Sequence, residues 1–443
     1  MMSGYVGDRA VVLGGSIAGS LAARILADAY REVTVVDRDD LTDRADPRHS
    51  APQGHHIHAL LARGQQILDE IFPGFTDELV TLGVPTGDFG TSLTWYFKGT
   101  AIKKAETGLT CVAAGRPLLE NRIRHRIRRL PHVMLREQTD VLGLVTSPDR
   151  RTVTGVRVQG RSRDSAEEVL AADLVVDATG RGTRTPRWLA ELGYPQVPEE
   201  RVKMDLTYTT CHFRGPLPFD PIGDDIALLP VATPAVRRGA IFARMPDRYS
   251  LSLTGVLGDR PPTDHEGFLA YAESLPIPEV YKALRAAEPI GPPTSFHFPA
   301  SIRRRYERQT RHLRGLLVMG DAACVFNPVY GQGMSVAAIQ SLVLREHLRQ
   351  GPPEPRAFFR DLAGAIDGPW DMSAGADLGF PEVQGRRTAK TRLGNAYVTR
   401  LQAAAAGDSE LSVAFLRAAG LVDPPQALMR PRLISRVLRG SAR

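Results

Sequence analysis

Short runs of apolar residues alternate with a segment of helical spacing at the start of the chain. Val11–Leu13 is fully apolar, Val33–Val36 is apolar except for Thr34, and Leu21–Ala29 between them carries apolar residues three and four positions apart. A buried strand, a helix and a second buried strand predict a parallel pair inside an α/β layer structure. The same short apolar pattern returns within Asp173–Thr183 and Leu313–Ala323. We therefore expect the layered domain to continue in those two segments.

A second pattern interrupts the first. In Thr91–Lys104, Met204–Arg214 and Gly239–Gly255, aromatic and β-branched residues alternate with polar ones. This alternation is typical of half-buried antiparallel strands. The final ninety or so residues are mainly helical in pattern, including Arg386–Ala405 and Ser409–Ala419. The simplest interpretation is an α/β domain interrupted by a β-rich insertion and followed by helices.

These changes of pattern predict where the parts of the chain begin and end. The α/β domain is expected in three parts, at residues 1–90, 111–200 and 301–350. The inserted strands are expected at residues 91–110 and 201–300, and the helical region at residues 351–443.

Composition removes several classes of protein. The formal net charge is +7, but no basic module with interleaved aromatic residues is present, so we expect no nucleic-acid partner. Cys111, Cys211 and Cys324 are far apart and show no CxxC spacing, which favours reduced thiols over a disulfide framework or a zinc site. No signal region or run of about twenty apolar residues is present, so we expect a cytoplasmic protein without a transmembrane segment. Arg430–Gly440 is interpreted as a helix that caps the body, with a basic surface-seeking helix as the alternative.

A glycine-rich turn follows the first strand. Gly14, Ser16 and Gly19 occupy the three positions of a G-x-G-x-x-G fingerprint, although serine replaces the second glycine. In this motif the first glycine permits the turn, the second lets backbone approach a pyrophosphate, and the third lets helix and strand pack closely. Asp37 follows the second strand, where an acidic residue binds ribose hydroxyls. The segment therefore predicts a site for one dinucleotide, and no second fingerprint follows.

A second group of residues has the chemistry to hold the other end of such a cofactor. Leu316–Met319 is expected to be a strand, which places Asp321 at its carboxyl end, where α/β folds bind ligands. Gly331, Gln332 and Gly333 then precede a strongly helical pattern over Met334–Leu348. Backbone amides at a helix start stabilise negative charge. An acid beside such a helix start suits a cofactor with a polyol at one end and an electron-accepting ring at the other, as in a flavin.

Three motifs in chain order carry a resemblance to a known family. They are "GGSIAG", "DLVVDATGRGT" and "GDAACVFNPVYGQGM". The chain resembles the FAD-dependent monooxygenases of the para-hydroxybenzoate hydroxylase and squalene epoxidase class. The resemblance implies a Rossmann-like FAD-binding domain of the glutathione-reductase type, with an inserted antiparallel substrate sheet and a helical C-terminal region.

The resemblance also implies roles for individual residues. Asp321 would contact the ribityl chain, and Gly331, Gly333 and Met334 would lie beside the isoalloxazine ring. "GRPLLENRI" is similar to a family segment in which an arginine, here Arg116, approaches FAD. Asp177 belongs to the family's middle motif, which helps to place FAD and the reductant. Here it reads Asp177-Ala178-Thr179-Gly180, where many relatives have Asp-Gly directly.

Two further stretches resemble a narrower group. "APQGHHIHALLARGQQILDEIFPGF" and "PPQALMRPRLISRVLRG" are similar to bacterial polyether epoxidases of the lasalocid and monensin type. Reaction type does not follow from that likeness alone, because members of the group need not all be epoxidases.

The family chemistry implies a reaction with O2. Reduced FAD forms a C4a-hydroperoxide, and one oxygen atom passes to the substrate, with NAD(P)H or a partner flavin reductase as the electron source. We expect a polyketide- or terpene-like secondary metabolite as substrate, with epoxidation favoured over hydroxylation. The main alternative is a FAD-dependent reductase or dehydrogenase of a prenyl or polyene substrate. Halogenation is less favoured because no WxWxIP-like stretch is present, and a non-enzymatic flavin or lipid binder is the third class.

Candidate substrate contacts come from two places. Trp95, Phe97 and Tyr208 lie on inserted strands, where aromatic residues also simply fill cores. Pro328, Val329 and Tyr330 precede the flavin-facing turn and are the better candidates. An apolar pocket with few polar groups favours an alkene over a phenolate, whose hydroxylation benefits from a positioned base.

A group of histidines near residue 56 has two interpretations. His55, His56 and His58 suggest a metal site at first sight, but no carboxylate or cysteine partner is near in sequence. Loop packing near FAD is therefore favoured over metal binding.

Overall fold

Two sheets organise the chain, and the computed structural model describes residues 4–42, 44–48, 51–58 and 60–440. The first sheet is fully parallel, with strand order β17-β11-β1-β2-β7. Its strands are β1 (Gly7–Leu13), β2 (Tyr30–Val36), β7 (Val133–Arg136), β11 (Leu174–Asp177) and β17 (Leu316–Val318). The strands predicted at Val11–Leu13, Val33–Val36 and Leu316–Met319 are confirmed with small shifts of their ends.

Helices cover the parallel sheet and share its core. They are α1 (Ile17–Leu26), α2 (Ala62–Ile71), α3 (Phe75–Thr81), α4 (Arg116–Arg128), α5 (Thr185–Glu191), α8 (Gln332–Arg349) and α9 (Pro355–Asp377). α1 packs against α8, and α8 packs against α9, whose Phe358 and Leu362 are buried in the same hydrophobic cluster as β1 and β17. The helix predicted at Leu21–Ala29 begins earlier, at Ile17, because the chain becomes helical directly after the glycine-rich turn.

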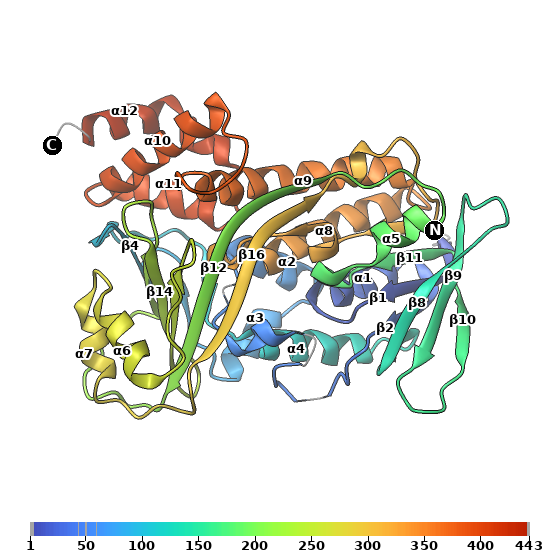
Figure 1. The fold of residues 1–443 in the computed structure, drawn as a ribbon, viewed down its shortest axis with the longest axis horizontal. Coiled ribbons are helices and arrows are strands. Elements are labelled where there is room, and N and C mark those ends of the chain that lie inside the picture. Colours follow the sequence, from blue (N-terminus) through green and yellow to red (C-terminus); the bar gives the residue numbers. More distant parts are fainter. Residues whose placement is uncertain (1–3, 43, 49–50, 59, 441–443) are drawn as a thin grey trace.

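The second sheet has eight strands in the order β18-β16-β12-β15-β14-β13-β4-β5. They are β4 (Leu93–Phe97), β5 (Thr100–Ala101), β12 (Glu199–Phe213), β13 (Ala227–Val231), β14 (Arg238–Arg244), β15 (Tyr249–Gly255), β16 (Thr294–Arg304) and β18 (Cys324–Val325). The long strands β12 and β16 pair along most of their length and run across the middle of Figure 1. α6 (His265–Glu273) and α7 (Pro278–Leu284) pack on one face of this sheet, around Phe213 and Phe242.

The inserted sheet is antiparallel as expected, with one exception. β4 pairs with β13 in parallel, with Leu93 opposite Ala227 and Phe97 opposite Val231. Alternation of polar and apolar residues predicts a half-buried strand but carries no information about the direction of its neighbour. The expectation of antiparallel pairing on both sides of the segment 91–104 was therefore wrong at this one pair.

Two smaller sheets complete the strands. β8 (Thr139–Thr146), β9 (Val153–Gly160) and β10 (Glu167–Ala171) form an antiparallel sheet beside the parallel one, and β3 (Thr86–Asp88) pairs with β6 (Thr110–Val112). Short 3₁₀ turns lie at η1 (Pro52–His55), η2 (Gly180–Gly182), η3 (Tyr306–Arg308), η4 (Gly320–Ala322), η5 (Pro328–Tyr330) and η6 (Pro425–Met429).

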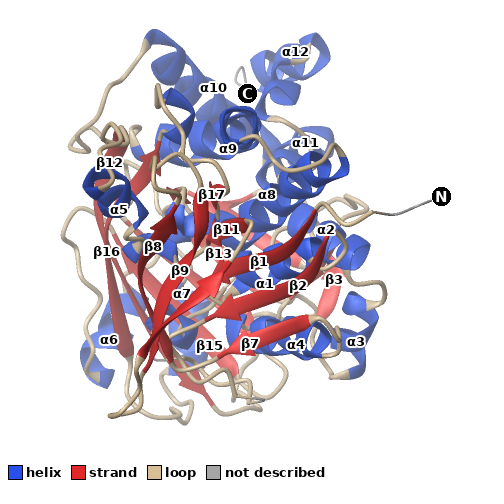
Figure 2. Ribbon diagram, turned by 90° about the vertical axis from the view of Figure 1, so that its right-hand side faces the viewer, coloured by secondary structure: helices blue, strands red, loops and turns tan. Residues whose placement is uncertain are grey.

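The last three helices gather at one end of the molecule, as both ribbon views show (Figures 1 and 2). They are α10 (Ala389–Ala405), α11 (Ser409–Ala419) and α12 (Pro431–Gly440). Leu433 and Val437 of α12 are buried in a cluster that also contains Leu93 and Ala227 of the large sheet. α12 is therefore a capping helix, as the sequence favoured. In the described ranges, none of the helices combines the length and apolar character that crossing a membrane requires.

Candidate cofactor site

The carboxyl ends of the parallel strands meet at one edge of the sheet. Leu13 is aligned with both Val36 and Asp177, and Asp177 is aligned with Val318. Because these strands end at the same level, the residues that follow them lie together. The glycine-rich turn, Asp37, the turn after β11 and the turn that contains Asp321 thus share one edge.

The glycine-rich turn has the geometry of a dinucleotide fingerprint. Gly14 has φ +96, a backbone conformation that favours glycine, and a Cβ on Gly19 would lie 1.7 Å from the Gly14 carbonyl oxygen. Gly19 thus lets α1 pack directly on the turn. Ser16 is the N-cap residue of α1 but makes no side-chain capping bond, so the first amides of the helix are available to an anion.

Ser16 belongs to a buried polar cluster. Its hydroxyl donates to Glu120 Oε1 at 2.5 Å and accepts from Arg116 Nη2 at 2.7 Å. Arg48 Nε donates to Glu120 Oε2 at 3.0 Å. Burial alone would raise the pKa of Glu120, but Arg116 and Arg48, with the Ser16 hydrogen bond, lower it to about 2. The departure from glycine at position 16 therefore supplies a hydroxyl that links the fingerprint to α4.

Arg48 and Glu120 were not among the predicted residues. Arg48 lies in an irregular loop after β2, where no sequence pattern sets its position. Glu120 offered a signal, because Arg116, Glu120 and Arg124 follow each other at i, i+4 spacing on α4. An acid between two arginines, all on one helix face, is an ion-paired cluster that the sequence alone could have indicated.

The two acids expected to face the cofactor, Asp37 and Asp177, accept hydrogen bonds from the turns around the site. Asp37 accepts from the Gly15 amide at 2.6 Å and from the Asp39 amide at 2.8 Å, and Arg48 lies 3.4 Å away. Asp177 is completely buried and accepts hydrogen bonds from Thr179, Thr183 and Thr185. Its carboxylate has no exposed surface for a ligand, so Asp177 shapes the turn around the site instead of offering a direct contact.

Asp321 and the start of α8 border the same open space. A Cβ added to Gly333 would meet nothing nearer than Asp321 Oδ1, at 4.0 Å. Burial raises the pKa of Asp321 although Arg116, Arg181 and Arg304 oppose the shift, yet the side chain keeps some exposed surface. A deeply placed but accessible carboxylate is typical of the wall of an internal cavity.

Arg304 fixes the turn that carries Asp321. Its guanidinium donates to the carbonyl oxygens of Asp321, Ala322 and Arg181, which joins η4 to η2. Gly320, at φ +66, lies so close to α1 that a Cβ would come within 2.6 Å of Ala18. The Asp321 turn is therefore held against the start of α1.

The turn before α8 also leaves a free helix start. Gly331 has φ +64 and begins α8 without a side-chain cap, and Met334 in the first turn is buried. Pro328, Val329 and Tyr330 form η5 and are each partly accessible. The structure thus brings Gly331, Gly333, Met334 and Asp321 together.

The segment that carries His55, His56 and His58, here called the histidine loop, lies between the large sheet and α8. His56 forms a hydrogen bond with Thr210 Oγ1 at 2.8 Å, and the Leu61 amide donates to Ser335 of α8 at 3.0 Å. His58 Nδ1–H donates to the His56 carbonyl at 3.0 Å, because a carbonyl oxygen only accepts. Burial and then the charge of Arg116 lower the pKa of His58 to about 4, so its Nε2 is unprotonated at neutral pH. His58 is the partly accessible residue of the loop nearest the Arg116 cluster.

The predicted aromatic contacts fall into two separate groups. Tyr208 is buried and packs edge-on against His56, with ring centroids 4.5 Å apart, beside the histidine loop. Trp95 and Phe97 pack instead against Phe415 of α11, with centroids 6.5 and 5.4 Å apart. These two residues, with Leu229, are only partly buried and keep some accessible aromatic and apolar surface near α11.

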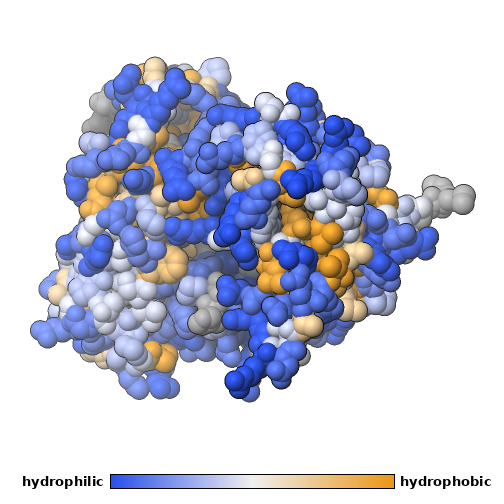
Figure 3. Space-filling view, turned by 45° about the vertical axis from the view of Figure 1, so that its right-hand side comes forward, coloured by the Kyte–Doolittle hydropathy of each residue, from blue (hydrophilic) through white to orange (hydrophobic). Residues whose placement is uncertain are grey.

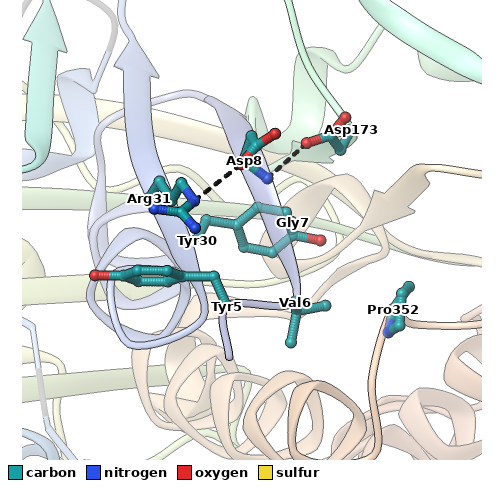
Figure 4. A pocket seen from close by; sticks show the side chains of 8 residues that line it. All are labelled: Tyr5, Val6, Gly7, Asp8, Tyr30, Arg31, Asp173 and Pro352. Carbon is teal, nitrogen blue, oxygen red and sulfur yellow. Dashed lines mark hydrogen bonds and ion pairs between the residues drawn. The ribbon is translucent and has the colours of Figure 1, made fainter. Parts of the chain in front are cut away.

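The surface is hollowed between two halves of the molecule (Figure 3). A separate cavity of about 440 Å³ lies where β1 and β2 begin, lined by Tyr5, Val6, Gly7, Asp8, Tyr30, Arg31, Asp173 and Pro352 (Figure 4). Seven residues of β1 separate that end from Gly14, a span of roughly 20 Å. This cavity is therefore distinct from the site at the carboxyl edge.

Histidine, cysteine and acidic residues form no cluster suited to a metal ion within the part of the chain that the structure describes. His55 is exposed and His56 is bound to Thr210, so the three histidines do not converge. Cys111, Cys211 and Cys324 are buried free thiols.

The fold is that of flavin-dependent monooxygenases and halogenases. The chain is similar to a flavoprotein/dehydrogenase from Cytophaga hutchinsonii, with a TM-score of 0.70, 13% identity and 98% of each chain covered. It is also similar to the flavin-dependent brominase Bmp2, with a TM-score of 0.68, 15% identity, and 94% of this chain and 93% of that chain covered. It is similar as well to PqsL, a probable FAD-dependent monooxygenase from Pseudomonas aeruginosa. The TM-score is 0.56 and the identity 16%, with 93% of this chain and 99% of that chain covered.

The chain belongs to the family of Protein Rv3254 from Mycobacterium tuberculosis. It is 33% identical to that protein over 468 aligned positions, which cover 100% of this chain and 96% of the relative. It is also 28% identical to a kynurenine 3-monooxygenase from Salinispora arenicola over 383 positions, 79% of this chain and 74% of that protein. No protein-family model matches the sequence.

Proposed function

We propose that this protein is a FAD-dependent monooxygenase. The observation that carries the proposal is the pairing of two uncapped helix starts with two sets of polar side chains at one sheet edge. Ser16, Arg116 and Glu120 lie at the first helix, and Asp321 lies beside Gly333 at the second. A cofactor with a pyrophosphate, a polyol and a ring matches that order of groups.

The residues present fit FAD in the following way. The amides at the start of α1, with Arg116, would hold the pyrophosphate. Asp321 would accept hydrogen bonds from the ribityl hydroxyls, and Gly331, Gly333 and Met334 would lie against the ring. Bound FAD would supply the activation of O2, which no side chain of the site provides. The protein would orient the substrate and exclude water.

The proposed reaction transfers one oxygen atom to an apolar substrate. O2, two electrons, two protons and substrate give oxygenated substrate and one water. The electrons come from NAD(P)H or from a partner flavin reductase. Trp95, Phe97 and Phe415 support an apolar substrate, because their aromatic side chains remain partly accessible and such surface favours an apolar ligand.

Within this class we propose a polyketide- or terpene-like secondary metabolite, with epoxidation favoured over hydroxylation. The buried hydroxyls and histidine on the inner sheet face are paired with one another, as in His56 with Thr210. Nδ1 of His56 is therefore already engaged and does not act as a base toward a phenol. This arrangement favours an alkene, as in the polyether epoxidases that the sequence resembles.

A second candidate is a FAD-dependent reductase of a prenyl or polyene substrate. The likeness to a flavoprotein/dehydrogenase supports it, since the same cofactor domain serves both chemistries. The brominase likeness does not favour halogenation to the same degree, because the sequence has no WxWxIP-like stretch.

Turnover under ¹⁸O₂ separates the two candidates. The purified holoenzyme is supplied with NAD(P)H, a flavin reductase and a panel of linear polyenes, and products are analysed by mass spectrometry. A monooxygenase places one ¹⁸O atom in the product, and an epoxide opens to a diol on mild acid treatment. A product that gains two hydrogens under anaerobic conditions would instead establish the reductase.

A further inference from the structure

A fully buried carboxylate closes α9 directly behind the turn that begins α8. Asp377 is the last residue of α9 and has no exposed surface. Its Oδ1 accepts from Asn327 Nδ2 at 2.9 Å and from the Tyr330 hydroxyl at 2.8 Å. Asp377 therefore ties two residues of the segment 327–330 to α9.

The other oxygen of this carboxyl is unusual. Asp377 Oδ2 is buried and has no hydrogen-bond partner among the described residues. An ionised carboxylate with one unpaired oxygen is costly to bury, and a protonated carboxyl costs much less because it carries no charge. The contacts that Oδ1 makes are compatible with both forms, since an amide and a phenol donate to either.

Charged groups do not compensate this carboxyl in the described part of the molecule. From η5, Tyr330 is the titratable side chain that faces it, and its hydroxyl is the donor. From the segment after α9, Arg387 donates to the carbonyl oxygens of Leu378, Phe380, Pro381 and Val383. From α10, the uncharged Asn395 binds the Gly375 carbonyl. Burial, only partly offset by Tyr330 and Asn327, raises the pKa of Asp377 to about 7.

The residues that Asp377 holds lead directly into the proposed ring site. Asn327 is buried and its Oδ1 accepts from the Val329 amide at 3.1 Å, which sets the start of η5. Gly331 follows Tyr330 and begins α8, beside Gly333 and Asp321. Tyr330 directly precedes Gly331. A change in the hydrogen bond between Asp377 and Tyr330 therefore reaches the backbone that borders the proposed ring site.

We propose that Asp377 is a positioning residue for the flavin-facing turn, and that its proton controls how that turn is held through Tyr330. This inference depends on the proposed function for its link to flavin. The protonation of Asp377 itself does not depend on flavin, so the two can be tested separately.

The first test measures unfolding of the protein without added flavin. In the unfolded chain an aspartate has a pKa near 3.8, and in the native protein that of Asp377 is about 7. The native state therefore holds a proton that the unfolded state has lost, and its stability falls as pH rises from about 4 to about 7. Asp377→Asn keeps an acceptor oxygen and has no charge to bury.

We compare the midpoint of thermal unfolding of Asp377→Asn with that of wild type at two pH values. The difference, variant minus wild type, should be more positive at about pH 8 than at about pH 5, by roughly 2 °C or more. Asp371→Asn is the matched control, because Asp371 lies on the same helix but is exposed and paired with Lys390. It should show no such dependence on pH. An effect of Asp377→Asn that is equal at both pH values would overturn the protonation of Asp377.

The second test uses the flavin-loaded protein and its visible spectrum. Wild type should show a spectral change between about pH 6 and pH 8 with a midpoint near 7, and Asp377→Asn should lose it. Tyr330→Phe should also lose the spectral change while it keeps the pH-dependent stability of wild type. A spectral change that persists unaltered in both variants would overturn the positioning role. Failure of wild type to bind flavin would overturn the proposed function and the link between Asp377 and flavin. The unfolding result would still test the protonation of Asp377.

Discussion

At the scale of single residues, the buried ion cluster around Glu120 is where we expect one substitution to lower the stability of the fold most. Glu120 is buried and is the acid shared by Arg48, Arg116 and Arg124, of which Arg124 is buried and Arg48 has a largely buried side chain. Removing one member of a buried ion pair leaves the partner charges uncompensated, which costs about 3–5 kcal/mol.

We predict that Glu120→Ala lowers the free energy of unfolding by about 3 kcal/mol or more near neutral pH. The folded-state pKa of Glu120 is lowered to about 2, so its contribution is present above the unfolded value of 4.5 and is lost as pH falls through 2. Urea unfolding at neutral pH and in acid checks this prediction. Equal stability of wild type and variant at neutral pH would contradict the buried ion cluster.

His58 is the residue of the histidine loop that we expect to affect bound flavin. Its Nδ1–H is used by the His56 carbonyl, so the neutral ring presents an acceptor at Nε2. We predict that His58→Gln shifts the visible spectrum or weakens FAD binding several-fold. His55→Gln should do neither, because His55 is exposed. Absorbance titration with both variants is the measurement, and identical curves would rule out the role of His58.

At the scale of elements, the close approach of α1 to the glycine-rich turn is the feature most sensitive to one added methyl group. A Cβ at position 19 would meet the Gly14 carbonyl oxygen at 1.7 Å, so the helix must move away from the turn. We predict that Gly19→Ala costs about 1–3 kcal/mol of stability and abolishes FAD retention. Gly364→Ala on α9 is the control, because nothing lies within 4 Å of its added Cβ. It should be neutral or slightly stabilising, by up to about 1 kcal/mol in a helix.

The helices at the C-terminal end cover one face of the large sheet, and Phe415 of α11 closes over Trp95 and Phe97. We predict that Phe415→Leu costs about 1 kcal/mol of stability through lost aromatic contacts. It should also raise the KM for the polyene that turns over in the ¹⁸O₂ experiment, with FAD affinity unchanged. An unchanged KM would place the substrate elsewhere.

At the scale of the whole molecule, the elements that could be predicted from the sequence are those set by residues close together in the chain. The segment from β1 to β2 and the helix after Gly331 follow from apolar spacing and glycine positions, and both are found. The parallel pairing of β4 with β13 joins segments distant in sequence. The small sheet β8–β10 joins neighbouring strands, but these were not predicted from the sequence.

The candidate site divides in the same way. Gly19 and Asp321 were predicted because motifs place them, whereas Arg48 and Asp377 were not, since tertiary contacts alone bring them to the site. Asp177 was correctly placed at a strand end, but its threonine partners lie in its own turn, so its role is indirect.

The proposed function requires one extended cofactor site between the starts of α1 and α8. The decisive measurement is calorimetric titration of FAD into flavin-free protein, for wild type, Arg116→Ala, Asp321→Asn and the exposed control Asp371→Asn. We predict one FAD per chain for wild type and the control, with binding weakened about tenfold or more in the other two, because each loses a hydrogen bond to a charged group worth about 1.5–3 kcal/mol. Absence of FAD binding to wild type, or equal affinity in all four proteins, would contradict the account.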